Sequence, residues 1–187
     1  VEIIYLKTKM DITNKIHFLT VQDYSVSQET FDLYLDESLD MLITNPQPSM
    51  DVLGKYYESA DYISHTDSKR SVFEKAYHFV KNIAIKNKLN LINSYQPSKG
   101  LILDIGAGTG DFLSNLDEQI KELKRLLKPN GTLIVAVPNF KSFEAKHYGV
   151  FWAAYDVPIH FWHFSNTAIQ KLFAKENMKL EKVLPMK

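Results

Sequence analysis

The apolar residues in the first half of the chain follow two patterns, a strand-like alternation and a helical spacing. Residues 31–48, FDLYLDESLDMLITNPQP, contain two alternating runs on either side of a polar centre. This pattern is typical of a β-hairpin that stops at the two prolines. Residues 49–97 instead carry apolar positions at helical spacing, with Ser49 as a suitable N-cap. We therefore expect a hairpin followed by helices.

The second half of the chain contains continuous apolar runs. Residues 101–106, LILDIG, and 132–137, TLIVAV, each lie next to turn-forming residues. Such runs favour parallel strands that are covered on both faces. Ser165 is a suitable cap for a helix over 166–176, and residues 178–185 are expected to form one more strand. The pattern thus predicts an α/β core.

These elements divide the chain into three regions. Residues 1–48 are expected to form a small β-rich region, 49–97 a helical lid or linker, and 98–187 the core. The turn-rich stretch SYQPSKG at 94–100 marks the joint before the core.

Composition narrows the class of protein. Of the 187 residues, 45% are hydrophobic, which is enough for one core. Lysine and arginine total 22, as do aspartate and glutamate, and this zero net charge argues against a protein that binds nucleic acid mainly through phosphates. The chain has no cysteine, which excludes disulfides, thiolate metal sites and a cysteine nucleophile.

The apolar runs also bear on location and partners. None is long enough to cross a bilayer, and the first residues lack the pattern of a signal peptide. We therefore expect a cytoplasmic protein with no membrane, nucleic-acid or metal partner. A small molecule is the expected ligand, and a homodimer is one candidate assembly.

The stretch LILDIGAGTGDF, residues 101–112, carries the clearest chemical signal. An apolar strand ends in Asp104, and three glycines then alternate with small residues before a predicted helix. Glycines allow a tight turn and close approach of a ligand, and the helix start offers unpaired N–H groups. Dinucleotide enzymes use the spacing G-x-G-x-x-G, whereas the third glycine here comes one residue earlier. Asp111 suits a ligand with ammonium or sulfonium charge better than a pyrophosphate.

Two motifs together resemble a known family. LILDIGAGTGDF closely resembles the first motif of class I S-adenosylmethionine-dependent methyltransferases, and IKELKRLLKPNGTLIVAVPN, residues 120–139, resembles their later helix, K-P-x-G turn and fifth strand. The resemblance implies a Rossmann-like parallel sheet, with S-adenosylmethionine as cofactor and S-adenosylhomocysteine as product. It places the glycine loop against the methionine part of the cofactor, whose amino group Asp104 would hold. The loop residues implied in cofactor binding are Asp104, Gly106, Ala107, Gly108, Gly110 and Asp111.

The resemblance also implies that central strands are missing. In the family a second strand ends in an acid that binds the ribose, about 20 residues beyond the first glycine. Leu126 lies in that region here, inside a predicted helix. We therefore expect that the chain joins two segments near Asn115–Leu116, and that the core is also incomplete at its C-terminus. The alternative is one continuous helix that connects two adjacent strands.

Residues 139–165 follow the predicted fifth strand and contain two tryptophans, two tyrosines and three histidines. They resemble the fWaa-D-P-x-H-x-x-H-F-s segment of a bacterial methyltransferase subgroup, which family resemblance places beside the transferable methyl group. Methyl transfer is an in-line displacement that often needs a base, and histidine suits that task near pH 7. His160 is the first candidate for base or substrate ligand, Asp156 would orient it or the substrate, and His163 is the second candidate.

Aromatic residues provide further candidates. Trp152, Tyr155 and Trp162 are expected to form walls of the acceptor pocket. Residues 54–68, GKYYESADYISHTDS, resemble a lid segment of the same subgroup. The contacts implied there are Tyr57 and His65 to the cofactor and Tyr62 to the substrate. For all these aromatic and histidine residues, packing in a core is the alternative role.

Relatives in this subgroup often begin with a zinc ribbon that carries C-x-x-C pairs. This chain has no cysteines, so we expect residues 1–48 to keep the shape without the metal, as a substrate-recruiting or dimer-forming region. The expected function is methyl transfer to an O, N or C atom of a small molecule. The alternative is a non-catalytic module that binds the cofactor. The glycine spacing and Asp111 argue against a third class, an NAD(P)-dependent oxidoreductase.

Overall fold

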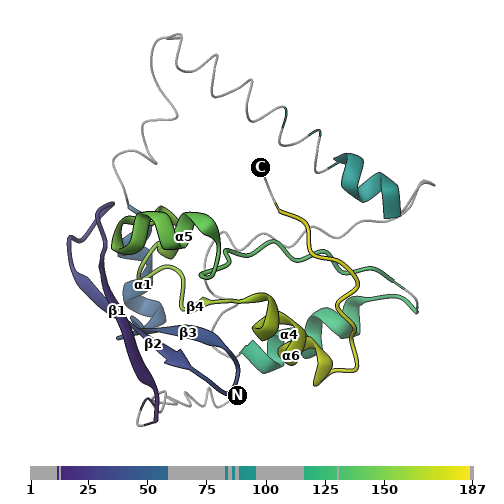
Figure 1. Cartoon of the computed structure of the whole chain (residues 1–187), viewed down its shortest axis with the longest axis horizontal. Helices are drawn as coiled ribbons and strands as arrows, with labels where there is room; N and C mark the ends of the chain where they lie inside the picture. Colours follow the sequence, from purple (N-terminus) through teal and green to yellow (C-terminus); the bar gives the residue numbers. More distant parts are fainter. Residues whose placement is uncertain are drawn as a thin grey trace.

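The computed structural model describes residues 12, 14–58, 83, 86, 89–95, 116–129 and 131–185 (Figure 1). Four strands form one sheet in the order β1-β2-β3-β4, and each neighbouring pair is antiparallel. The strands are β1 (Ile16–Gln22), β2 (Thr30–Asp36), β3 (Met41–Asn45) and β4 (Trp162–His163). Because β4 comes from far along the chain, the sheet joins the N-terminal strands to the segment after residue 139.

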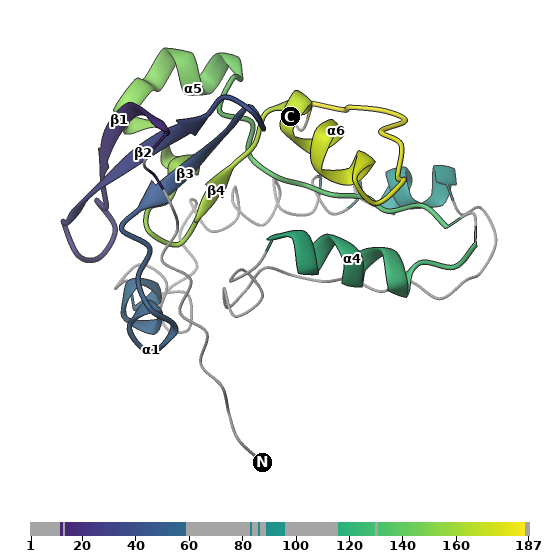
Figure 2. The ribbon, with the colours of Figure 1, turned by 90° about the horizontal axis from the view of Figure 1, so that it is seen from below.

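Short helices surround this sheet. They are α1 (Met50–Leu53), η1 (Gly54–Tyr57), α4 (Leu116–Leu126), α5 (Phe143–Tyr148), η3 (Gly149–Phe151), η4 (Ala153–Tyr155) and α6 (Asn166–Ala174). α4 and α6 lie side by side, and α5 lies away from them in both views (Figures 1 and 2). An ion pair of 3.3 Å between Lys175 Nζ and Asp117 Oδ1 connects the end of α6 to α4.

Two apolar clusters cover the two faces of the sheet, and β3 contributes to both. Met41 and Ile43 point to one face, whereas Leu42 between them points to the other, as expected for the alternation of side chains along a strand. The first cluster also contains Leu53, Ile120, Phe161, Trp162, Ala168 and Leu172. The second contains Val21, Phe31, Leu33, Phe140, Tyr155 and Val157. β3 is therefore buried on both faces, which explains its continuous apolar sequence.

The predicted hairpin within residues 31–48 is confirmed, because β2 and β3 pair through the turn at 37–40. Asp36 Oδ1 accepts hydrogen bonds from Ser38 Oγ at 2.5 Å and from Leu39 N at 3.1 Å. Asp40 ends the turn with a φ of 59°, a left-handed conformation that aspartate tolerates better than most residues.

Two helix starts predicted from local patterns are also confirmed, whereas most of the predicted helical region 49–97 lies outside the described residues. α6 begins after Ser165, whose Oγ accepts a hydrogen bond from Ala168 N. α1 begins after Ser49, although the Ser49 side chain makes no capping hydrogen bond. The described residues between 83 and 95 are helical.

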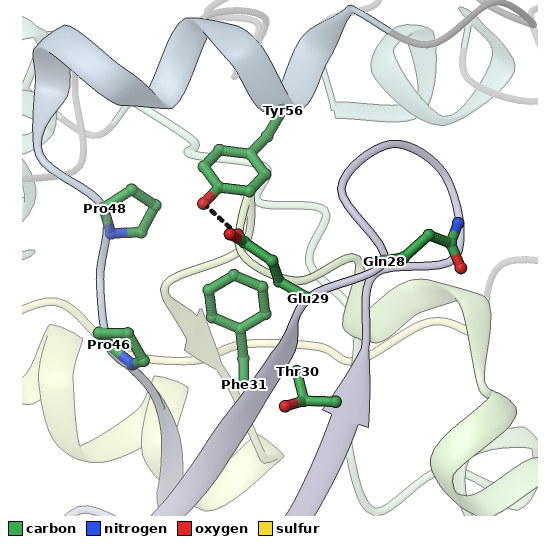
Figure 3. A pocket seen from close by; sticks show the side chains of 7 residues that line it. All are labelled: Gln28, Glu29, Thr30, Phe31, Pro46, Pro48 and Tyr56. Atoms are coloured by element: carbon green, nitrogen blue, oxygen red, sulfur yellow. Dashed lines mark hydrogen bonds between the residues drawn. The ribbon is translucent and has the colours of Figure 1, made fainter.

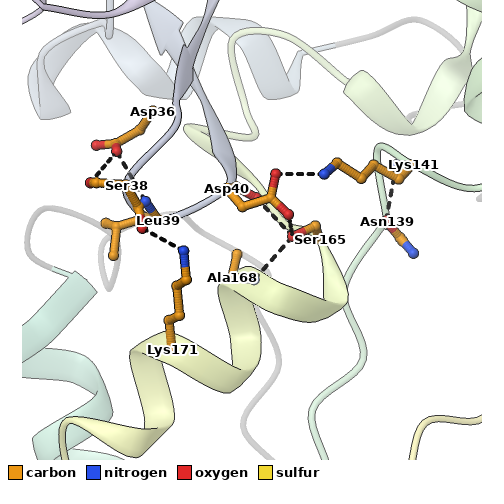
Figure 4. A network of polar contacts seen from close by, with 9 residues as sticks. All are labelled: Asp36, Ser38, Leu39, Asp40, Asn139, Lys141, Ser165, Ala168 and Lys171. Carbon is orange, nitrogen blue, oxygen red and sulfur yellow. Dashed lines mark hydrogen bonds and ion pairs between the residues drawn. The ribbon is translucent and has the colours of Figure 1, made fainter.

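A network of polar contacts ties the β2–β3 turn to α6 and to the segment before α5 (Figure 4). Asp40 Oδ1 lies 2.5 Å from Lys141 Nζ, and Ser165 Oγ donates to Asp40 Oδ2 at 2.8 Å. Lys171 Nζ donates to Ser38 O at 2.7 Å. Burial acts to raise the pKa of Asp40, but the hydrogen bonds from Lys141 and Ser165 lower it below its usual value.

Replacing Ser165 with alanine removes both the α6 cap and the contact with Asp40. We expect the free energy of unfolding to decrease by about 1–2 kcal/mol in urea denaturation. Ser142 is a matched control, because it caps α5 through Ala145 N and has no contact with Asp40 among the described residues. Ser142→Ala is expected to have the smaller effect, and an equal or larger loss in this control would contradict the assigned role of the Asp40 contact.

The expected Rossmann-like parallel sheet is wrong. The sheet is antiparallel throughout, and residues 132–137 form no strand. Ile134, Val135 and Val137 are 45%, 42% and 40% exposed. A continuous apolar run predicts a buried strand only where neighbouring strands cover it, and no described strand lies beside this run. Residues 178–185 likewise form no strand, and Val183 is 52% exposed.

Other parts of the α/β expectation concern residues outside the described ranges. The expected first strand at 101–106 and Asn115 of the Asn115–Leu116 junction lie outside the described residues. α4 is described over Leu116–Leu126, where the pattern predicts a helix. β4 shows that residues of the first and third expected regions share one sheet.

Candidate active site

The segment from Gly149 to His160 folds into consecutive tight turns. η3 and η4 follow each other, and Asp156 ends η4 with φ 39° and ψ 53°. The N–H of Asp156 donates to Ala153 O at 3.1 Å, and the N–H of His160 donates to Asp156 O at 2.9 Å. These turns place the backbones of Asp156 and His160 in hydrogen-bond contact.

His160 is held by contacts at its ring and its backbone. Its Nδ1 lies 3.1 Å from Ala154 O, and its carbonyl accepts a hydrogen bond of 2.7 Å from Thr44 Oγ1. Because a carbonyl oxygen only accepts, we assign the proton of the neutral ring to Nδ1. Nε2 then carries the lone pair, and it has no hydrogen-bond partner among the described residues. The half-buried ring therefore presents one defined basic atom.

Asp156 interacts electrostatically with both His160 and the β1–β2 loop. Although Asp156 is exposed, partial desolvation of its carboxyl raises its pKa, a positive charge on His160 would oppose this effect, and the charge of Asp23 adds to it. Asp23 lies in the β1–β2 loop, where its carboxylate accepts backbone hydrogen bonds from Ser25 and Ser27 at 2.9 and 2.8 Å. Burial acts to raise the pKa of Asp23, but these hydrogen bonds lower it.

His163 lies on β4 and is only 1% exposed. Its Nε2 is 3.1 Å from Thr44 Oγ1. Since the Thr44 hydroxyl donates to His160 O, its oxygen accepts from Nε2–H, which fixes the neutral tautomer of His163. Burial, with a smaller contribution from the charge of His160, lowers the pKa of His163 to about 3. Thr44 thus connects a buried neutral histidine to the backbone of His160.

The aromatic candidates lie on both faces of the sheet. The rings of Trp152 and Tyr155 meet edge to face, with centroids 5.0 Å apart, and Tyr155 also packs edge to face on His163 at 5.4 Å. Trp162 is buried in the cluster of Met41 on the other face. Tyr57 ends η1 and packs against that same cluster. Trp152 and Tyr155 are therefore the aromatic candidates that lie with the His160 segment.

The remaining predicted site residues belong to the lid segment and the glycine stretch. They are Tyr62, His65, Asp104, Gly106, Ala107, Gly108, Gly110 and Asp111, and all lie outside the described residues. Conversely, the structure adds Thr44 and the carbonyl of Ala154 as groups that hold His160. No sequence pattern marks either one, because a backbone carbonyl carries no residue signature and Thr44 is a single hydroxyl within a strand.

In the described part of the chain, no group of three or more histidine and acidic side chains could hold a metal ion. No described helix combines the length and apolar character needed to cross a membrane. Comparison with protein-family models, curated proteins and solved structures gave no match for this chain.

Proposed function

We propose that the chain is an S-adenosylmethionine-dependent methyltransferase that acts on an O, N or C atom of a small molecule. The observation that carries this proposal is the stretch LILDIGAGTGDF at 101–112, together with the K-P-N-G block at 128–131. The proposal depends on these motifs and on the His160 segment.

The donor groups of the glycine stretch suit this cofactor. The carboxylate of Asp104 would hold the amino group of the methionine part, and the backbone at Gly106, Gly108 and Gly110 would allow close approach. Asp111 adds negative charge near a ligand that carries positive charge. Tyr57 and His65 are proposed as further contacts. When bound, S-adenosylmethionine supplies a methyl group on a positively charged sulfur.

His160 is proposed as the general base. With Nδ1 held by Ala154 O, Nε2 would take the proton from the acceptor atom as the new bond to the methyl carbon forms. The electron pair of the broken carbon–sulfur bond stays on sulfur, which leaves S-adenosylhomocysteine. Asp156 would orient the acceptor or His160, and Trp152 would wall the acceptor side, with the buried Tyr155 packed behind it.

His163 takes a positioning role in this proposal. It is enclosed, and it acts on His160 through the Thr44 hydroxyl, which binds both His163 Nε2 and His160 O. Fixing the backbone of His160 limits the positions that its ring can occupy, and such alignment contributes to the rate of an in-line displacement.

Calorimetric titration of the chain with S-adenosylhomocysteine and S-adenosylmethionine tests the cofactor assignment. We expect binding in the micromolar range for both. Asp104→Asn is expected to weaken binding at least about tenfold, because it removes the counter-charge of the amino group. Asp117→Asn is the matched control, since Asp117 lies on the exposed surface of α4, and it should bind as the unaltered chain does. Absence of heat with both ligands would refute the proposal.

The non-catalytic alternative makes a different prediction for turnover. A chain that only binds the cofactor would show heat in calorimetry and no transfer of labelled methyl groups to a metabolite extract. An NAD(P)-dependent oxidoreductase would instead bind NAD(H) or NADP(H).

A further inference from the structure

The start of β2, the prolines after β3 and η1 line a pocket of about 560 Å³ (Figure 3). We call it the Glu29 pocket. Its lining includes Glu29, Phe31, Pro46, Pro48 and Tyr56. The two prolines face the rings of Phe31 and Tyr56 across the pocket, and the Glu29 carboxylate lies at the hydroxyl end of the Tyr56 ring (Figure 3). None of these residues belongs to the cofactor or catalytic groups proposed above.

Glu29 provides the charge of this pocket. Tyr56 Oη donates to Glu29 Oε2 at 2.6 Å. Glu29 forms no ion pair within the described ranges, and no lysine, arginine or histidine lines the pocket. The hydrogen bond to Glu29 is the main cause that raises the pKa of Tyr56 to about 12, with burial and the charges of Glu29 and Asp23 adding to it. Tyr56 therefore stays protonated, and the lining residues that the structure describes include one acidic group and no basic group.

The aromatic wall is fixed by the core. Phe31 is 4% exposed and belongs to the cluster of Leu33. Its ring meets that of Tyr56 edge to face, at 6.0 Å and 76°. Pro46 and Pro48 form an apolar wall opposite. A wall that keeps its shape without a ligand lowers the entropic cost of binding one.

These features select among ligand classes. An anion would meet the charge of Glu29, and a metal ion would find a single carboxylate among the lining residues. An uncharged apolar ligand would cover Glu29 without offering it a counter-charge, which is unfavourable. An organic ammonium ion suits this lining, because its charge would face Glu29 and the half-buried ring of Tyr56 while its alkyl groups contact the prolines.

We propose that the Glu29 pocket binds an organic ammonium ion. The inference goes beyond the proposed methyl transfer and does not rest on it. Its test uses no S-adenosylmethionine, so failure of one proposal is distinguishable from failure of the other.

The first experiment compares a cation with an uncharged ligand of the same shape. Choline has a positively charged nitrogen at its branched centre, where 3,3-dimethylbutan-1-ol has an uncharged carbon. The two ligands therefore have nearly the same shape and differ in charge. We expect choline to bind at least about tenfold more tightly in calorimetric titration of the full chain. Equal affinities, or no binding of choline at concentrations up to about 100 mM, would overturn the proposal.

The second experiment assigns the binding to this pocket. Glu29→Gln keeps the size of the side chain and an oxygen that accepts from Tyr56, but removes the charge. We expect the Kd for choline to increase at least about tenfold. Glu181→Gln makes the same change at a side chain that is 72% exposed, and it should leave the Kd unchanged. An unchanged Kd in Glu29→Gln, or an equal increase in both variants, would overturn the assignment.

Discussion

Lowering the pH from 7.5 to 4.5 is expected to decrease the free energy of unfolding by about 3 kcal/mol, because His163 binds a proton only in the unfolded chain. His163 is 1% exposed, and its pKa is lowered from 6.5 to about 3 in the fold. Above pH 6.5 neither state binds this proton, so the contribution to stability is fully present. Between pH 6.5 and about 3 each unit of pH costs about 1.4 kcal/mol.

Urea denaturation at several pH values measures this effect. His163→Gln is expected to flatten the dependence between pH 6.5 and 4.5, whatever its effect on stability at pH 7.5. His147→Gln changes an exposed histidine and should keep the slope of the unaltered chain. Asp36 has its pKa lowered to about 2 by its hydrogen bonds to Lys15 and Ser38, which outweigh burial. The contribution of Asp36 to the free energy of unfolding is therefore lost only below its unfolded pKa of 3.8, which lies outside the range from pH 6.5 to 4.5. The same slope in His163→Gln and in the unaltered chain would contradict the prediction.

Replacing His160 with asparagine is expected to reduce the rate of methyl transfer by about 10²–10⁴-fold. Asparagine retains an N–H group that can donate to Ala154 O, as His160 Nδ1 does, but it has no basic nitrogen in place of Nε2. We expect cofactor binding to be unchanged and kcat to decrease. The acidic limb of the pH–rate profile, which reports protonation of a base, should disappear.

His147→Asn is the matched control, because the exposed His147 lies on α5 and has no part in the proposed chemistry. Its rate and pH profile should be those of the unaltered chain. If His160→Asn retained full activity, or lost activity with an unaltered pH profile, His160 would not be the base.

Local patterns predicted the parts of the fold that depend on local interactions. The β2–β3 hairpin has alternating side chains and a polar turn, and α6 begins at the cap of Ser165. β4 could not be predicted, because two residues have no periodicity and it is a strand only through its pairing with Leu42 and Ile43. The run at 132–137 was misread for the opposite reason, since its composition favours a strand but no described strand pairs with it.

The sequence suggests candidate side chains for the site but contains no information about their surroundings. His160, Asp156 and His163 stand out as residue types within a short aromatic segment. Their environments come from distant contacts, since Thr44 of β3 determines the tautomer of His163 and Asp23 of the β1–β2 loop acts on Asp156. Spacing along the chain contains no information about such contacts.

β4 has a consequence for proteolysis. β4 pairs with the edge of a sheet made by N-terminal strands, and both apolar clusters combine N-terminal residues with residues from the second half of the chain. A cut between Glu58 and Leu116 would therefore leave two fragments with complementary surfaces. Such fragments should remain associated as a nicked complex under native conditions and separate only in denaturant.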